Sequence, residues 1–223
     1  MKRPETRPRQ PNLVQEQVML SPEAKQMIID NYRGRFHKYG AGPKVAEWNS
    51  VESQEMRFEQ LCKLGDMQGA SVLDIGCGIA DMYPYVLQKF GTIKYTGVDL
   101  VQETIDHARQ AYAASDAVFV CQDIINDPLP EDMRFDYVTI SGIFNNDVPH
   151  AVQFLETMTE VAFGLALKGL GFNFLSTYRS YDDAGAYYHD PVPVLRHCLE
   201  RLSKKTTLFH HYGRADVSVF VYR

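Results

Sequence analysis

From residue 70 onward, short apolar segments alternate with amphipathic segments along the chain. The apolar segments have the length of buried strands, and the segments between them carry apolar residues at helical spacing. This alternation predicts an α/β fold, in which a mostly parallel, doubly wound sheet is covered by helices on both faces. The expected strands lie within residues 70–76, 94–100, 117–123, 135–142, 170–176, 206–212 and 216–223. The last two are separated by a short turn, so they must pair antiparallel.

Two helices are expected before the first strand. Residues 21–23 supply an N-cap serine, a first-turn proline and a first-turn acid, which predicts a helix ending near Tyr32. Residues 33–44 are rich in glycine and basic side chains, and we expect them to form a loop that is a candidate lid. Asn49, with a glutamate three residues later, resembles a capping box for a second helix that ends near Gly65.

Composition excludes several classes of protein. The formal net charge of −5 argues against a nucleic-acid partner, which would require a concentrated basic face. No segment approaches the ~20 apolar residues of a membrane span. The four cysteines are scattered without a CxxC pair, which is typical of reduced thiols in a cytoplasmic protein rather than of zinc ligands or disulfides.

The segment "SVLDIGCGIADM", residues 71–82, predicts a ligand site where a buried strand enters a turn. In open α/β sheets, ligands bind at the carboxyl ends of the strands. Gly76 and Gly78 permit a tight turn and the close approach of a ligand. We expect main-chain amides of this turn and the start of the next helix to meet that ligand.

Two acids in this segment limit what the ligand can be. A dinucleotide fingerprint would have a third glycine where Asp81 stands. The carboxylates of Asp74 and Asp81 would repel a pyrophosphate, but they suit a ligand with a positive amino group. S-adenosylmethionine, which carries an amino group and a sulfonium, fits these acids, and a nicotinamide oxidoreductase stays a minor alternative.

The next two strands also end in acids. Asp99 ends the second strand, where a carboxylate can accept hydrogen bonds from both ribose hydroxyls. Asp123 ends the third strand, where it can meet the adenine edge. Leu100 and Ile124 follow these acids and are available as apolar walls for the ring.

Taken in order, "VLDIGCGIAD", "YTGVDL", "VCQD" and "FDYVTISGIFN" resemble the successive motifs of the class I S-adenosylmethionine-dependent methyltransferases. The resemblance covers roughly residues 45–223. It implies a seven-stranded sheet with the last strand antiparallel, S-adenosylmethionine as methyl donor and S-adenosylhomocysteine as product. One departure is Ala80, which stands where the family often has a third glycine.

The resemblance also assigns cofactor residues. It implies that Asp74, Gly76, Cys77 and Gly78 line the methionine side and that Arg57, on the second helix, meets the cofactor's carboxylate. Ser141 and Gly142 are expected to pass under the cofactor. The complete expected cofactor set is Arg57, Asp74, Gly76, Cys77, Gly78, Asp81, Asp99, Leu100, Asp123, Ile124, Ser141 and Gly142.

The acceptor is expected beside the loops that follow the fourth and fifth strands. Asn145 and His150 are the candidate catalytic residues, with His150 as a possible base, although packing or helix capping explains each histidine as well. Tyr39, Tyr188 and His189 are candidate substrate contacts. Asn146, Asp147, Asp182 and Asp183 are oxygen ligands by type, but they lie among ordinary turn residues, so we expect no metal.

These observations predict three parts of the chain. Residues 1–20 form a flexible basic tail, residues 21–66 form an N-terminal extension of helices with the candidate lid, and residues 67–223 form the methyltransferase domain. We expect a cytoplasmic enzyme, monomeric or homodimeric, that methylates an oxygen or nitrogen atom of a small molecule. The alternative is a non-catalytic regulatory or assembly protein that binds the same cofactor.

Overall fold

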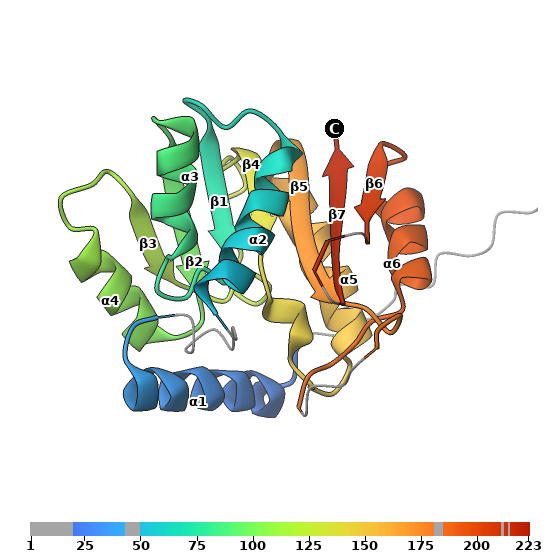
Figure 1. The fold of residues 1–223 in the computed structure, drawn as a ribbon, viewed down its shortest axis with the longest axis horizontal. Coiled ribbons are helices and arrows are strands. Elements are labelled where there is room, and N and C mark those ends of the chain that lie inside the picture. Colours follow the sequence, from blue (N-terminus) through green and yellow to red (C-terminus); the bar gives the residue numbers. More distant parts are fainter. Residues whose placement is uncertain (1–19, 43–49, 181–184, 211, 214) are drawn as a thin grey trace, which may run out of the picture.

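A computed structural model describes residues 20–42, 50–180, 185–210, 212–213 and 215–223. Its centre is a seven-stranded sheet in the order β3-β2-β1-β4-β5-β7-β6 (Figure 1). Strands β1 to β5 pair in parallel, and β7 runs antiparallel to both of its neighbours, β5 and β6. The predicted fold class is therefore confirmed. The strands are β1 (Ser71–Ile75), β2 (Lys94–Asp99), β3 (Val118–Cys121), β4 (Phe135–Ile140), β5 (Ala166–Leu175), β6 (Thr206–Phe209) and β7 (Asp216–Tyr222).

Helices cover both faces of the sheet. On one face, α2 (Val51–Leu61), α3 (Met82–Phe90) and α4 (Gln102–Ala111) bury an apolar cluster with β1, β2 and β3. On the other face, α5 (Ala151–Leu165) and α6 (Pro191–His197) bury a second cluster against β4, β5 and β7. Short helical turns extend α2 at Cys62–Leu64 and α6 at Cys198–Leu202, and a third, Ile143–Asn145, follows β4.

The first helix, α1 (Pro22–Tyr39), is longer than the sequence predicted. The proposed loop at residues 33–44 is helical through Tyr39, and Gly40 ends the helix. Gly34 lies inside the helix, where glycine costs about 1 kcal/mol relative to alanine. Contacts with α4 accompany this extra length: Arg33 Nε lies 2.5 Å from Glu103 Oε1, and the ring of Phe36 packs against that of His107.

Figure 1 shows α1 below the sheet, on the side toward which β1 points, whereas β7 points the other way. A second ion pair, between Lys25 Nζ and Asp123 Oδ2 at 2.9 Å, joins α1 to the segment after β3. Ala24 and Ile28 of α1 are buried against Val148 and Ala151. The helix thus lies across the carboxyl ends of the strands, where the sequence predicts the ligand.

The N-cap of α2 is Ser50 rather than Asn49, because the Ser50 side chain accepts a hydrogen bond from the Ser53 amide at 3.2 Å. Asn49 itself lies outside the described residues, as do the predicted tail up to residue 19 and residues 43 and 44 of the proposed loop.

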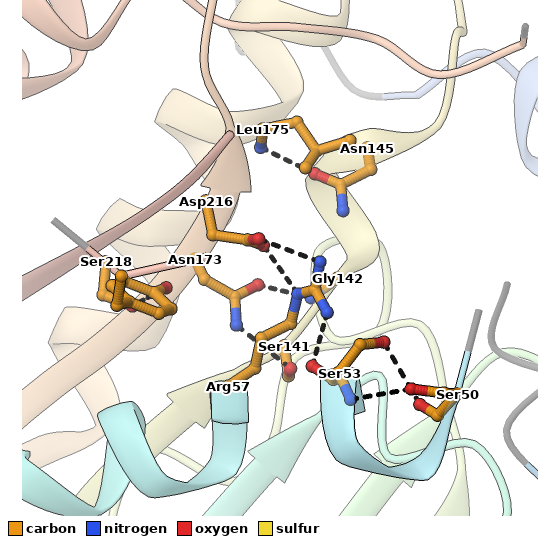
Figure 2. Close-up of polar contacts among 11 residues, drawn as sticks. Ser50, Ser53, Arg57, Ser141, Gly142, Asn145, Asn173, Leu175, Asp216 and Ser218 are labelled. Atoms are coloured by element: carbon orange, nitrogen blue, oxygen red, sulfur yellow. Dashed lines mark hydrogen bonds and ion pairs between the residues drawn. The ribbon is translucent and has the colours of Figure 1, made fainter. Parts of the chain in front are cut away.

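A buried ion pair joins α2 to the start of β7. Arg57 is 8% exposed, and its guanidinium donates two hydrogen bonds to Asp216, from Nε to Oδ1 at 2.6 Å and from Nη2 to Oδ2 at 3.0 Å (Figure 2). Its Nη1 also donates to the carbonyl oxygen of Ser53 at 2.6 Å. Asp216 is therefore a paired buried charge.

Replacing Arg57 with methionine should lower the free energy of unfolding by about 3–5 kcal/mol, because it leaves the Asp216 carboxylate buried without its partner. Urea unfolding measures this loss. Arg201→Met is the matched control, since Arg201 pairs with Glu160 on the surface and such pairs contribute about 0–1 kcal/mol. Equal losses in the two variants would show that the buried pair stabilises the fold no more than the surface pair does.

Candidate functional site

A cavity opens at the carboxyl ends of β1 to β4, with walls from α1, α2 and the turns that follow these strands. The structure brings every predicted cofactor residue except Arg57 to this cavity. Those lining it are Asp74, Gly76, Cys77, Gly78, Asp81, Asp99, Leu100, Asp123, Ile124, Ser141 and Gly142. Residues far apart in the sequence thus share one wall, as expected when neighbouring parallel strands end at the same edge.

The amides of the glycine turn are occupied within the protein. Gly76 N and Cys77 N both donate to the carbonyl oxygen of Val98, at 2.7 and 3.1 Å, and Gly78 N donates to Asp99 Oδ2 at 2.8 Å. These three amides therefore have partners within the protein, and their contact with the ligand stays a prediction. With these donors used, this part of the wall suits a ligand that donates hydrogen bonds rather than a phosphate.

The two glycines of this turn have different roles. Gly76 has φ +76°, and a Cβ there would overlap Cγ2 of Ile143, so the absence of a side chain permits close packing of two loops. Gly78 has φ +55°, and no heavy atom lies within 4 Å of the position of its missing Cβ. Gly78 therefore leaves open space beside the turn, in the cavity wall.

Ala80, which stands where the family often has a third glycine, has φ +64° and is buried. Its amide donates to the carbonyl oxygen of Cys77 at 2.8 Å. The backbone at this position has the left-handed conformation that glycine adopts most easily, so the alanine keeps the shape of the turn at some cost in strain.

Asp74 is buried at the end of β1 and accepts two side-chain hydrogen bonds. Tyr95 Oη donates to its Oδ2 at 2.5 Å, and Thr139 Oγ1 donates to its Oδ1 at 3.2 Å. Burial raises the pKa of Asp74 to about 7, although both hydrogen bonds act in the opposite direction. A positive ligand group nearby would favour the ionised form.

Asp99, at the end of β2, accepts amide hydrogen bonds from Gly78 and, at 2.9 Å, from Val101. Burial raises its pKa above the usual value, and these hydrogen bonds limit the rise. The carboxylate therefore fixes the glycine turn and lines the cavity at the same time.

Gln54 of α2 contributes a polar group to the cavity that the sequence analysis did not assign. Its side chain is 6% exposed, and its Nε2 donates to Asp81 Oδ2 at 2.9 Å. Arg57, one turn later, is directed to Asp216 and does not line the cavity, so its predicted contact with the cofactor's carboxylate is not supported. Helical spacing placed both residues on one side of α2, but it could not show which of them faces the ligand.

The Asp123 carboxylate has partners both in the loop after β3 and on α1. Its carboxylate accepts from the amides of Ile125 and Asn126 and from Asn126 Nδ2, and it pairs with Lys25 of α1. Burial acts to raise its pKa, but the hydrogen bonds from Asn126 and Lys25 hold the pKa below the usual value. Asp123 is thus a carboxylate that α1 covers.

A hydrogen-bonded network behind the cavity anchors the loop that follows β4 (Figure 2). Asn173 of β5 accepts from Gly142 N at 2.8 Å and donates to Ser141 Oγ at 3.1 Å. Asn145 accepts from Leu175 N at 3.0 Å through its Oδ1. Two asparagine side chains therefore tie this loop to β5.

The two candidate catalytic residues do not line the cavity. Asn145 is a loop anchor, since its side chain is bonded to the end of β5 and its carbonyl oxygen accepts from Tyr187 N. His150 is the exposed N-cap residue of α5, with φ +61° and no capping hydrogen bond from its side chain. His150 thus stands at the N-cap position, but its side chain does not cap the helix as the alternative from the sequence expected.

The three candidate substrate contacts also lie outside the cavity wall. Tyr39 ends α1 between two basic side chains, and Tyr188 has the guanidinium of Arg179 3.6 Å above its ring. His189 is 2% exposed, its Nε2 donates to the carbonyl oxygen of Phe144 at 3.0 Å, and burial lowers its pKa. His189 is therefore a neutral packing residue.

Apolar side chains complete the cavity, and the sequence analysis did not assign them to it. They include Leu20, Ile28 and Tyr32 around α1, Phe58 of α2, and Phe154 and Met158 of α5. Their helical spacing was visible, but it does not distinguish a face that packs on the core from one that lines a cavity.

Within the described ranges, no three histidine, cysteine or acidic residues lie together as metal ligands. Of the oxygen ligands considered above, Asp182 and Asp183 lie outside those ranges. Among the same described residues, no helix combines the length and the apolar character that crossing a membrane requires.

Gly76→Ala should lower the free energy of unfolding by about 2–5 kcal/mol, from strain at positive φ and overlap with Ile143. Ile143→Ala in the same chain should recover part of this loss, because it removes the methyl group that the new Cβ meets. Urea unfolding of the two single variants and the double variant gives the coupling. Strictly additive losses would contradict the close packing of the two loops.

Asp74→Asn should gain stability relative to the wild type as the pH rises. A carboxyl group whose pKa is raised on folding contributes stability that is lost as pH rises through the folded pKa, here about 7. The asparagine does not titrate, so the unfolding free energy of the variant minus that of the wild type should be larger at pH 8 than at pH 5. Asp132→Asn, at an exposed position, is the control for a lost charge. A pH-independent difference would contradict the raised pKa.

Comparisons with known proteins agree with this geometry. A family model described as a methyltransferase domain matches residues 72–162, from β1 into α5. A putative methyltransferase of Mycobacterium tuberculosis is 28% identical over 160 residues, which are 68% of this chain and 92% of that protein. A fatty-acid O-methyltransferase of Mycolicibacterium smegmatis is 31% identical over 127 residues, but the match covers 56% of this chain and only 41% of that protein.

Solved structures show the same fold. Magnesium protoporphyrin IX methyltransferase from Synechocystis PCC 6803, with bound SAM, has a TM-score of 0.65 at 16% identity, over 90% of this chain and 97% of that one. N-methyltransferase NodS from Bradyrhizobium japonicum WM9, in complex with S-adenosyl-L-homocysteine, has a TM-score of 0.61 at 15% identity, over 87% and 98%. Residues 72–162 therefore match a methyltransferase domain, and the chain shares its fold with methyltransferases whose structures hold SAM or S-adenosyl-L-homocysteine.

Proposed function

We propose that this chain binds S-adenosylmethionine in the cavity at the strand ends and transfers its methyl group to an oxygen or nitrogen atom of a small molecule. The observation that carries the proposal is that four acids, Asp74, Asp81, Asp99 and Asp123, line the same cavity as Gly78. Such a wall favours a cationic ligand and opposes a pyrophosphate.

The residues present fit this cofactor. Gly78 leaves room for a ligand beside the turn, and the amides of Gly76 to Gly78, which an anion would need, are already bonded. Asp99 is the candidate acceptor for the ribose hydroxyls, and Leu100 and Ile124 are candidate walls for the adenine. The acids near the turn suit the amino group and the sulfonium.

When bound, the cofactor supplies a methyl group on a positively charged sulfur. The chain's own contribution is to hold the acceptor atom in line with the methyl carbon and the sulfur and to keep water away. No histidine among the described residues lines the cavity, so the proposal rests on alignment rather than on a histidine base.

The acceptor end supports a small molecule with an apolar body. Ile28 and Tyr32 of α1 and Ile143 of the loop after β4 contribute mostly apolar surface to the cavity. Lys25 and Arg33 of α1 are paired with acids of the protein. The relatives include one named a fatty-acid O-methyltransferase and one named an N-methyltransferase, so the acceptor atom is proposed as oxygen or nitrogen.

Calorimetry and label transfer test the proposal together. Ligand-stripped protein should bind S-adenosylhomocysteine, and Asp99→Asn should weaken that binding at least tenfold, or about 1.4 kcal/mol, through lost charge-assisted hydrogen bonds. With S-adenosylmethionine labelled on its methyl group, the wild type should label an organic-soluble compound in a small-molecule cell extract. Asp116→Asn, at an exposed position beyond the cavity, is the control.

Each outcome decides between the alternatives. Binding without transfer to any fraction would favour the non-catalytic regulatory or assembly protein. Transfer to macromolecules alone would contradict the small-molecule acceptor. Absence of binding would remove the proposal, and binding of NAD in its place would favour the oxidoreductase.

A further inference from the structure

We propose that Asn173 is a positioning residue of the cofactor site and that it acts through Ser141 and Gly142. It lies on β5, outside the motifs that carry the cofactor contacts, and none of its atoms lines the cavity. The inference rests on the proposed function only in taking S-adenosylhomocysteine as the ligand to be measured.

The geometry gives Asn173 two bonds to one loop (Figure 2). The residue is 1% exposed. Its Oδ1 accepts from Gly142 N at 2.8 Å, and its Nδ2 donates to Ser141 Oγ at 3.1 Å. The main-chain N–H of Gly142 can only donate, so the atom of the Asn173 side-chain amide that faces it must be the oxygen. This fixes the orientation of the Asn173 side-chain amide.

The loop needs such support where it leaves the sheet. Gly142 has φ +82°, so the chain turns sharply after Ser141 and the ladder of β4 ends. An N–H that is shielded from water and has no partner destabilises the fold. Gly142 N lies beyond the end of β4, and the Asn173 side chain supplies its hydrogen-bond acceptor. The same side-chain amide also donates to the Ser141 hydroxyl.

The supported residues form a wall of the cavity. Ser141, Gly142 and Ile143 line it, and Ile143 packs against Gly76 of the glycine turn, where no Cβ would fit. A shift of the loop would therefore alter both the wall under the cofactor and the packing of the turn. Asn145, which accepts from Leu175 N, anchors the far end of the loop, whereas Asn173 anchors its start.

Asparagine suits this role because its side chain offers an acceptor and a donor. Aspartate keeps the acceptor for Gly142 N, and the Ser141 hydroxyl can turn to donate to its second oxygen. Alanine removes both bonds. The neighbouring strand supplies a matched control in Ser218, which is fully buried, pairs with Asn173 in the ladder and bonds to Tyr212 rather than to the loop.

The test compares the Kd for S-adenosylhomocysteine, by calorimetry, of Asn173→Ala, Asn173→Asp and Ser218→Ala with that of the wild type. All measurements are made well below the melting temperature of each variant. We expect Asn173→Ala to raise the Kd at least tenfold, Asn173→Asp to stay within threefold, and Ser218→Ala to stay within twofold. Rescue by aspartate is the result that a loss of packing alone would not give.

Three results would overturn the proposal. The first is an unchanged Kd in Asn173→Ala despite a lower melting temperature, which would make the residue structural only. The second is an equal loss in Ser218→Ala, and the third is the absence of rescue by aspartate. If Asn173→Ala does not fold, Asn173→Ser is measured instead, and a change below threefold counts against the proposal. Failure of the wild type to bind would contradict the proposed function instead.

Discussion

The main constraint in this structure is the bonding of the turn after β1 to the end of β2. The carbonyl oxygen of Val98 accepts from both Gly76 and Cys77, and the carboxylate of Asp99 accepts from Gly78. These bonds satisfy the turn's amides inside the protein and fix its shape before any ligand arrives. Because Gly76 also lacks a Cβ where Ile143 packs, the ends of β1, β2 and β4 are packed together at one corner of the cavity.

The bonding of these amides also affects which charge of ligand the cavity wall suits. An unoccupied row of amides would attract an anion, but here the remaining wall carries carboxylates. Asp74 and Asp99 have raised pKa values because they are buried, so their ionised forms lack full compensation from the protein. A ligand with a positive group supplies the missing compensation. The same burial that costs stability would therefore favour a ligand with a positive group at this wall.

The sequence predicted the sheet, the antiparallel hairpin and a hollow at the strand ends, because strand length, helical spacing and strand-end acids are local signals. It underestimated α1, whose last turns are held by contacts with Glu103 and His107, seventy residues away in the chain. It assigned His189 to the substrate because a histidine in an aromatic run has the same local pattern whether it is buried or exposed. The bond from His189 to the carbonyl oxygen of Phe144 depends on how two distant loops meet, and no spacing in the sequence encodes that.

Arg57 illustrates a limit of transferring a motif by position. An arginine on the helix before the first strand is a plausible partner for a carboxylate ligand, and Arg57 does bind a carboxylate, but that of Asp216. A buried carboxylate such as that of Asp216, at the start of β7, is costly without a cation, and Arg57 of α2 is directed to it and does not line the cavity. Gln54, one turn earlier, then becomes the polar side chain of α2 that lines the cavity, bonded to Asp81. The pairing of Arg57 with one buried acid of the scaffold thus accompanies the placement of Gln54, rather than Arg57, in the cavity wall.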